Sequence, residues 1–307
     1  MYHSSIANIS VSIWKNLVSG QGETRYMHRS PNSKKFGNII PKNGNESKDT
    51  YIKINKHSYN VPYGDLWGYY NNGYYYYLDC AGLVRHILYD IDSRLMKPFN
   101  ELSPLIDIEK GIARVYPRAK TFYTLFTCDV NYKFDNIIRE KIKTLRNELI
   151  EMGWIFFVPS RDYSNLKPGD IMVKNLKLSK NTGHMGIFIS RGKDSTGNYI
   201  NVLESSSSHR KIKNLNDLIK EYNYYIPQYK ISKKDFKNNN IKNIKDLRNE
   251  LILYNNTDTL IKTKLYNSFN LHQTRGIASL LATNGGIRLS KWRWNNVKNY
   301  IIGRINV

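Results

Sequence analysis

The sequence of 307 residues predicts an α+β domain in which a helix packs on an antiparallel sheet. Two observations lead to this fold class. First, apolar residues follow Cys80 at the spacing of one helix face, namely Leu83, Val84, Ile87, Leu88 and Ile91. Second, short apolar segments separated by turn signals follow one another from residue 154 onwards, a pattern typical of neighbouring antiparallel strands. A chain of this length has room for one catalytic domain enlarged by insertions.

The chain before Cys80 shows little regular patterning. Residues 20–60 are rich in Gly, Ser, Asn and Lys, so we predict a loop-rich segment over 1–62, ahead of a domain at 63–307. The apolar stretch at 6–14 has neither a basic leader nor a small-residue cleavage site, and is a poor signal peptide. A run dominated by Tyr, Gly and Asn at 63–77 then leads directly into Cys80.

Two stretches do not belong to the predicted core. Residues 93–130 contain three prolines and indicate irregular chain with short helices, followed by a long helix over 134–152. Residues 211–265 are dense in Lys and Asn, with helical patterns near 215–219 and 244–253. We interpret these stretches as parts of two insertions, at about 93–150 and 210–283.

The sheet is predicted from strands spread over the second half of the chain. The strands are expected at 154–158, 171–173, 183–189, 199–204, 286–289 and 300–305. A tight turn at 166–170, L-K-P-G-D, precedes the second of them, and a hairpin at 192–197 joins the third and fourth into a meander. The last two strands close the same sheet.

Composition excludes several classes of protein. Hydrophobic residues make up 40% of the chain and aromatic residues 13%, which is too apolar for a disordered protein. The sequence contains no run of 18 apolar residues, so it predicts no membrane-spanning helix. The two cysteines, Cys80 and Cys128, lie outside any Cys/His cluster with zinc spacing, so we predict neither a metal nor another cofactor.

The charge balance has two interpretations. Lys and Arg number 47 against 25 Asp and Glu, a net charge of +22 that attracts polyanions such as nucleic acid, anionic wall polymers and anionic lipid headgroups. The excess is carried mostly by Lys among Asn, Ile and Tyr, which is also the profile of an AT-rich coding sequence. The charge is therefore either a means of localisation or a product of composition.

Three residues in order predict catalysis. Cys80 opens a helix, where unpaired N–H groups and the helix dipole stabilise a thiolate and, later, an oxyanion. His184 heads an apolar strand, and Glu204 ends the next strand on the face of Val202, from which it can reach His184. Singly, such a cysteine or histidine is often structural. Together they have the composition of a thiolate, its proton shuttle and the group that orients the shuttle.

These residues also carry a resemblance to a known family. D-C-A-G-L-V at 79–84 resembles the D-C-S-G-[LF]-V helix start of the NlpC family of papain-like cysteine peptidases. L-K-P-G-D at 166–170 and G-H-M-G-I at 183–187 resemble its L-x-P-G-D turn and H-V-G-I strand. P-R-A-K-T-F-Y at 117–123, T-G-H at 182–184 and E-S-S-S-S-H at 204–209 are similar, more loosely, to an uncharacterised bacterial branch of the superfamily.

The resemblance implies a papain-like NlpC-type core with Cys80 as nucleophile, His184 as general base and Glu204 as orienter. Ala81 stands where wall-cleaving members carry a serine that, with the aspartate retained here as Asp79, holds the amino end of a stem peptide. The other expected substrate-binding residues are Tyr63, Trp67, Tyr69 and His209, for which strand packing or loop capping is the alternative role. Glu204 also departs from the His, Asn or Gln most often found at the third position.

The leading hypothesis is a cysteine hydrolase that cleaves a peptide amide, above all in bacterial peptidoglycan, through an acyl-enzyme. Its expected partners are the peptide substrate and an anionic wall polymer or membrane surface rather than nucleic acid, and its expected place is the cell envelope or outside the cell. One alternative is an acyltransferase, thioesterase or host-directed effector of the same fold, acting on lipid or protein. Another is a basic binding protein without enzymatic activity.

Overall fold

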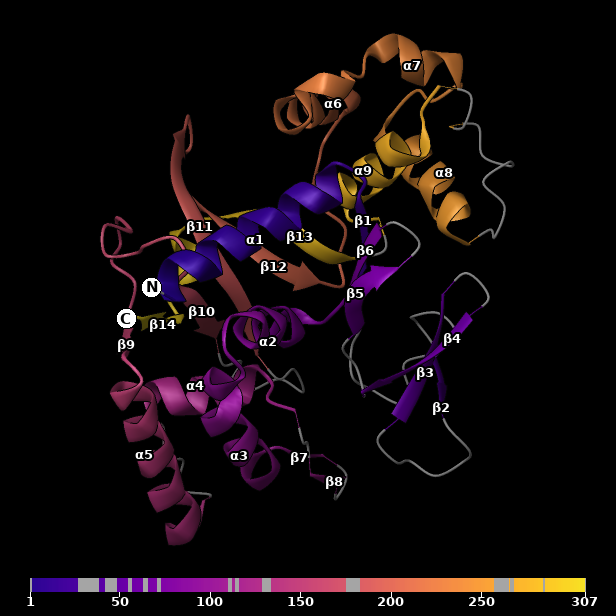
Figure 1. Ribbon diagram of the computed structural model, residues 1–307. Coiled ribbons are helices and arrows are strands. Elements are labelled where there is room, and N and C mark those ends of the chain that lie inside the picture. The colour runs from indigo at the N-terminus through magenta and orange to yellow at the C-terminus, as the bar shows by residue number, and fades with distance from the viewer. Residues whose placement is uncertain are drawn as a thin grey trace. The chain divides into compact units, whose positions relative to one another are not determined.

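A computed structural model gives the structure of the protein (Figure 1). It describes residues 2–26, 39–41, 49–54, 57–62, 66–70, 73–109, 112–113, 116–128, 134–174, 183–256, 265, 268–283 and 285–306. No helix among these residues is both long enough and apolar enough to cross a membrane.

The chain divides into two compact units, and the boundaries between them do not fall at residue 62. The first unit comprises Met1–Ser12, Cys80–Glu204 and Leu289–Val307, and the second comprises Ile13–Asp79 and Ser205–Arg288. Each unit therefore contains segments that are far apart in the sequence.

The first unit is built on a mixed helix and sheet architecture, which confirms the α+β class. The sheet has six strands in the order β13-β12-β11-β10-β14-β9. The strands are β9 (Trp154–Phe157), β10 (Ile171–Lys174), β11 (His184–Asp194), β12 (Gly197–Ser206), β13 (Gly286–Trp292) and β14 (Ile301–Ile305). The four pairs β12–β11, β11–β10, β10–β14 and β14–β9 are antiparallel. The C-terminal strand β14 lies between β10 and β9, in the same sheet, as predicted.

The two faces of this sheet are covered by different elements, because side chains alternate along each strand. On one face, Met172, Phe188, Val202 and Ile302 form a buried cluster with residues near the chain end, which include the short helix α10 (Trp294–Val297). On the other face, Gly303 leaves room for the ring of Phe126, so that a helix packs closely on β14.

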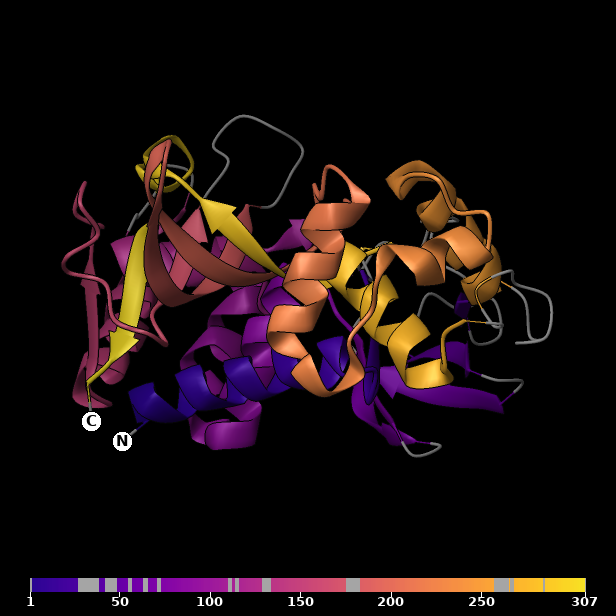
Figure 2. The same cartoon turned by 90° about the horizontal axis from the view of Figure 1, so that it is seen from above.

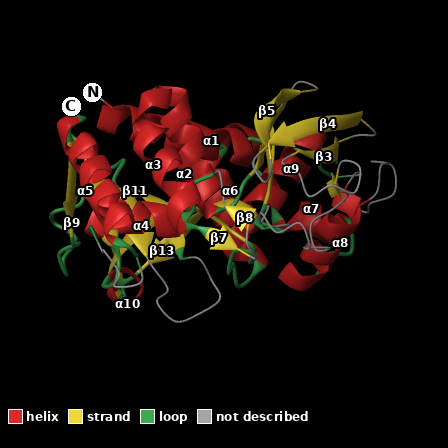
Figure 3. Cartoon of the chain, turned by 90° about the horizontal axis from the view of Figure 1, so that it is seen from below, coloured by secondary structure: helices red, strands yellow, loops and turns green. Residues whose placement is uncertain are grey.

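Four longer helices of the first unit lie on this second side (Figure 3). They are α2 (Cys80–Ile91), α3 (Lys97–Ile106), α4 (Ala119–Thr127) and α5 (Asn136–Glu151), with a 3-10 turn η1 (Ser93–Met96) after α2 and a two-stranded ribbon, β7 (Ile108–Glu109) and β8 (Ile112–Ala113), after α3. Short helices at 93–130 and a long helix at 134–152 were expected and are confirmed. Phe99, Phe122, Phe126 and Trp154 form the aromatic core between them, with ring centroids 4.2 to 6.2 Å apart.

The expectation of a loop-rich segment before residue 62 is wrong. The chain starts with helix α1 (Tyr2–Val18), whose first residues belong to the first unit and whose remainder belongs to the second. Ile6, Ile13, Trp14 and Leu17 are buried at helical spacing. The apolar residues of the stretch at 6–14 thus lie on the buried face of a helix.

The second unit contains two small sheets. One has the order β1-β6-β5 and the other β2-β3-β4. The strands are β1 (Gly22–Arg25), β2 (Ile39–Pro41), β3 (Asp49–Ile54), β4 (His57–Pro62), β5 (Leu66–Tyr70) and β6 (Gly73–Tyr77). The tyrosine-rich stretch thus forms the hairpin β5–β6, and its last two tyrosines, Tyr76 and Tyr77, are buried.

Helices make up the rest of the second unit (Figure 2). They are α6 (Leu215–Tyr225), η2 (Pro227–Tyr229), α7 (Lys233–Asn238), α8 (Ile244–Asn256) and α9 (Leu271–Leu281). The helices expected near 215–219 and 244–253 are confirmed as α6 and α8. Asn214 caps α6 by accepting a hydrogen bond from the N–H of Asp217 at 3.0 Å, which explains where that helix begins.

Candidate active site

Cys80 is the first residue of α2, as the sequence predicts. Its side chain is in no disulfide and is almost covered, with 8% of the residue exposed. The neighbouring Asp79 and Ala81 are also buried. α2 packs against β11 (Figure 1), so the amino end of the helix is held beside the strand that carries His184. The positive end of the dipole of α2 lies at Cys80 and stabilises an anion at the sulfur.

His184 is the first residue of β11, and the glycine before it makes this position accessible. Gly183 has a φ of +92°, and a Cβ there would collide with the Lys174 carbonyl and press on the Cβ of Ala119. The glycine of the T-G-H motif therefore lets the chain turn sharply into β11. Thr182 of that motif lies outside the described residues.

Glu204 reaches His184 across the β11–β12 pair. Ile187 faces Leu203 in this register, and one step further along the pair Gly186 comes opposite Glu204. A Cβ at Gly186 would collide with Cγ1 of Val202, so this glycine lets β12 approach closely beside His184. Its Oε2 atom hydrogen bonds with Nε2 of His184. The Glu204 side chain is 3% exposed and that of His184 is 26% exposed, so the carboxylate is buried behind the ring.

The imidazole joins the thiol to the carboxylate. Since Nε2 is occupied by Glu204, the hydrogen bond between His184 and Cys80 uses the other ring nitrogen, Nδ1. Burial of the ring opposes protonation, but the charge of the Cys80 sulfur, the hydrogen bonds to Cys80 and Glu204, and the Glu204 charge outweigh it and raise the pKa of His184 to about 10. At neutral pH the ring is therefore protonated and lies between the Cys80 sulfur and the Glu204 carboxylate.

Three further residues surround this triad, and no motif of the sequence pointed to them. They are Lys174 on β10, Trp292 on β13 and Tyr300 just before β14. The ring of Trp292 lies 5.8 Å from that of His184 and 4.9 Å from that of Tyr300. Burial, and then the charges of Glu204 and Cys80, raise the pKa of the Tyr300 phenol far above its usual value of 10.0. Lys174 faces His184 across the β10–β11 pair, and its Nζ lies 5.9 Å from the Tyr300 ring centroid.

The P-G-D motif has a structural role. Asp170 is fully buried and accepts hydrogen bonds from Arg304 Nε at 2.7 Å and from Arg304 Nη2 at 2.8 Å. It also accepts one from the backbone N–H of Lys167 at 2.8 Å, and His3 Nε2 lies 3.4 Å from it. This ion pair joins the turn before β10 to β14, and so fixes the middle of the sheet that carries His184.

In the second unit, the segments that flank the triad in sequence are joined by one buried hydrogen bond. Ser205 Oγ, directly after Glu204, donates to the carbonyl of Leu78 at 2.6 Å, and both residues are fully buried. The bond attaches the end of β12 to the chain just before Cys80.

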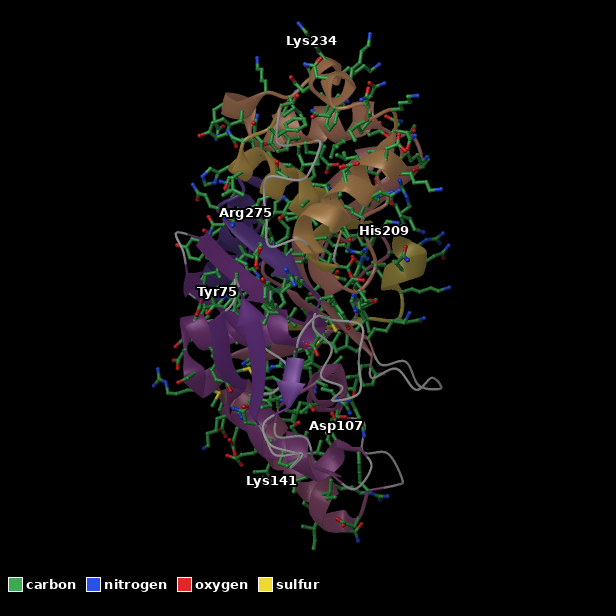
Figure 4. The ribbon with its side chains drawn as sticks, turned by 90° about the vertical axis from the view of Figure 1, so that its right-hand side faces the viewer. Tyr75, Asp107, Lys141, His209, Lys234 and Arg275 are labelled. Carbon is green, nitrogen blue, oxygen red and sulfur yellow. The ribbon has the colours of Figure 1, made fainter. Side chains whose placement is uncertain are left out.

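The remaining predicted substrate-binding residues belong to the second unit or lie outside the described chain. Tyr63 lies outside the described residues. Trp67 and Tyr69 are on β5, opposite Tyr76 and Tyr74 of β6. His209 is exposed (Figure 4), and burial together with the charges of Arg248, Arg288 and Lys211 lowers its pKa. None of these positions is brought together with the triad within the first unit.

Comparisons with protein-family models, with curated proteins and with solved structures found no match to this chain. The chemistry of the site is therefore judged from its own geometry. In the part of the chain that the structure describes, no group of three or more His, Cys, Asp or Glu side chains is arranged to hold a metal ion. The arrangement of Cys80, His184 and Glu204 suits nucleophilic attack by sulfur with proton transfer through imidazole.

Proposed function

We propose that the protein is a cysteine hydrolase with a papain-like, NlpC-type core that cleaves an amide through an acyl-enzyme. The observation that carries this proposal is the connected series from the Cys80 thiol through both nitrogens of His184 to the Glu204 carboxylate. A helix that presents its first residue to an antiparallel sheet supports the core assignment. The order of the three motifs along the sequence supports it independently.

The first half of the reaction is acylation. The Cys80 thiolate attacks the carbonyl carbon of the scissile amide, and the oxygen becomes an oxyanion that accepts a hydrogen bond from the backbone N–H of Cys80. His184 Nδ1 then gives its proton to the amide nitrogen, the C–N bond breaks, and the amine leaves. A thioester remains on Cys80, and His184 is neutral.

The second half is hydrolysis of the thioester. Neutral His184 takes a proton from water, and the resulting hydroxide equivalent attacks the thioester carbonyl. The C–S bond breaks, the carboxylic acid product leaves and gives its proton to solvent, and the thiolate–imidazolium pair is restored. Glu204 holds the ring through Nε2 during both halves and stabilises its charged form. The Tyr300 phenol stays protonated beside these charges and supplies a neutral hydrogen-bond donor.

The substrate class is proposed to be a peptide of bacterial peptidoglycan. The motif resemblance supports this class, and Asp79, retained before the nucleophile, supports binding of an amino group. Ala81 lacks the hydroxyl that would share this task, so we expect a bond other than the one cleaved by members with the serine. An anionic wall polymer is the proposed attachment for the basic surface, and export to the envelope is proposed with it.

The test is incubation of purified sacculi with the full-length protein and with Cys80→Ala, followed by mass spectrometry of the released fragments. We expect fragments with new amino and carboxyl ends from the wild type alone. Equal release by both proteins would eliminate the proposal. A stable acyl adduct on Cys80 from lipid or protein, with no wall fragment released, would replace it by the acyltransferase or thioesterase alternative.

A further inference from the structure

The second unit contains a basic groove that the catalytic triad does not use. The groove has a volume of about 940 Å³ and lies among α6, α7 and α8. Five lysines line it, namely Lys213, Lys233, Lys234, Lys237 and Lys242, and no Asp or Glu lines it. Lys234 lies at the outer end of this group of helices in Figure 4. A concave surface lined by one sign of charge concentrates an anionic ligand.

Two carboxylates close in sequence to these lysines, Asp235 and Asp246, are engaged in capping their own helices. Asp235 accepts hydrogen bonds from the backbone N–H and the Oγ of Ser232, at 2.7 and 2.8 Å. Asp246 accepts from Asn243 Nδ2 at 3.0 Å and from the backbone N–H of Lys242 at 3.2 Å. All five lysines are exposed, and none has an ion-pair partner within the described ranges. Their charge is therefore not neutralised by an ion pair among the described residues.

Two of the groove lysines lie where the helix dipole is unfavourable to a cation. Lys233 and Lys234 are the first two residues of α7. Cations at this end of a helix are repelled by its dipole, and acidic residues are the favourable choice there. Across residues 213–244 the sequence has seven lysines against three acidic residues and no arginine. A local electrostatic cost that is kept in a groove points to binding.

We propose that this groove binds a polymer of phosphodiesters whose linkers carry hydroxyl groups and no bases. Lysine presents a compact charge that suits single phosphodiesters, whereas arginine would favour planar, bidentate contacts. Asn216 and Asn238 line the same groove, and their amides can both donate to and accept from hydroxyl groups. The lining contains only Lys, Asn, Leu and Ile, so it has no aromatic ring on which a base could stack.

The concave shape of the groove favours a polymer strand over a membrane surface as its ligand. A peripheral membrane site combines basic residues with apolar side chains that enter the bilayer. Here two of the apolar lining residues, Ile241 and Ile244, are buried and form part of the hydrophobic interior of the helices. The charge of the groove thus complements a polymer strand better than a flat lipid surface. The proposal goes beyond the hydrolase activity and does not depend on Cys80.

The test is to measure the affinity of the protein for a lipid-free poly(glycerol phosphate) by calorimetry at several salt concentrations. The groove variant is Lys233→Gln, Lys234→Gln and Lys237→Gln together. The matched control is Lys220→Gln, Lys230→Gln and Lys245→Gln, which removes the same charge from exposed lysines outside the groove. At 0.15 M salt we expect the groove variant to bind about tenfold or more weakly than the wild type. The slope of log K against log salt should become less steep by about two. The control should change affinity by less than about twofold.

Three results would overturn the proposal. Equal losses in the two variants would show that overall charge, and not the groove, attracts the polymer. Binding of a single-stranded DNA oligonucleotide as tight as that of the polymer would make the groove a nucleic-acid site. Binding to phosphatidylglycerol vesicles but not to the free polymer would make it a membrane site. Thermal unfolding of each variant by circular dichroism checks that the lysine changes leave the fold intact, and Cys80→Ala should bind as the wild type does.

Discussion

The triad of the first unit and the groove of the second unit use charge in opposite ways. At the triad, the carboxylate is buried and the charged groups have defined partners, since His184 hydrogen bonds with both Glu204 and Cys80. In the groove, five like charges stand exposed, with no acidic residue among the lining. Buried, paired charges interact strongly in a low-dielectric environment, whereas exposed charges are screened and act by their sum. Single substitutions should therefore have large effects in the first region and small ones in the second.

The largest effect is expected at His184. His184→Ala removes both the proton donor to the leaving amine and the base for thioester hydrolysis, so kcat/KM on a susceptible peptide should fall on the order of 10⁴-fold. It also removes the imidazolium that pairs with the sulfur. Alkylation of Cys80 by iodoacetamide at neutral pH should then become slower, as followed by intact mass. A variant with wild-type turnover would show that the ring takes no part in the chemistry.

The next largest effect concerns the buried ion pair between Asp170 and Arg304. Asp170→Ala leaves the Arg304 guanidinium buried without its main partner, which should lower the free energy of unfolding by about 3–5 kcal/mol. Urea denaturation followed by fluorescence measures this. Replacing both residues with apolar ones, Asp170→Leu with Arg304→Met, should recover most of the loss.

An exposed pair in the same unit is the control for this prediction. Lys143 and Glu140 are 53% and 70% exposed, with Nζ 2.7 Å from the carboxylate. Glu140→Ala should change the free energy of unfolding by less than about 1 kcal/mol. Similar losses at Asp170 and Glu140 would contradict the difference drawn between buried and exposed charges.

How far the sequence predicted this molecule depends on whether the signal was local. The helix at Cys80 and the β11–β12 pair follow from periodicity, and the strand alternation placed Glu204 on the correct face for His184. Tyr300 was missed because nothing near it in the sequence shows that β14 lies between β10 and β9. The groove was missed for the same reason, since its lysines lie on α7 and on the chain just before α6 and α8. A lysine excess was visible, but not the concave surface it lines.

The third prediction concerns the pH dependence set by Glu204. Glu204→Gln keeps a hydrogen-bonding group but removes a negative charge that helps raise the pKa of His184. The imidazolium must be present to protonate the leaving amine, so activity is lost as pH rises through the pKa of His184. In the variant this alkaline limb should move to lower pH, and kcat/KM should fall on the order of 10²-fold. An alkaline limb in the same place would rule out Glu204 as the orienting group.

The same raised pKa has a consequence for stability. In the unfolded chain His184 titrates near 6.5, and in the folded protein near 10. The stabilisation from its protonation is therefore complete below about pH 6.5 and is lost as pH rises toward 10. Glu204→Gln should reduce this loss between the two pH values, which urea denaturation at pH 6 and pH 10 can measure.

The fourth prediction concerns Tyr300. Tyr300→Phe keeps the ring contact with Trp292, 4.9 Å between centroids, and removes only the hydroxyl. If the phenol donates to the reacting groups, kcat should fall by about tenfold while KM and the urea midpoint stay nearly unchanged. Trp292→Phe is the matched change of an aromatic neighbour without a hydroxyl loss, and should affect stability more than kcat. A rise in KM alone, with kcat unchanged, would instead assign Tyr300 to substrate contact.

The smallest effect is expected for one lysine of the groove. Lys234→Gln removes one exposed charge of five, so the affinity for poly(glycerol phosphate) should fall by less than about threefold and the salt slope by about 0.7. Adding Lys233→Gln and Lys237→Gln in turn should lower the slope by a similar amount each time, because screened charges on a flexible anion act nearly independently. A loss of tenfold or more from Lys234→Gln alone would instead show a single dominant contact. The groove would then resemble the triad, with one defined partner for one charge, and the contrast between the two regions would not hold.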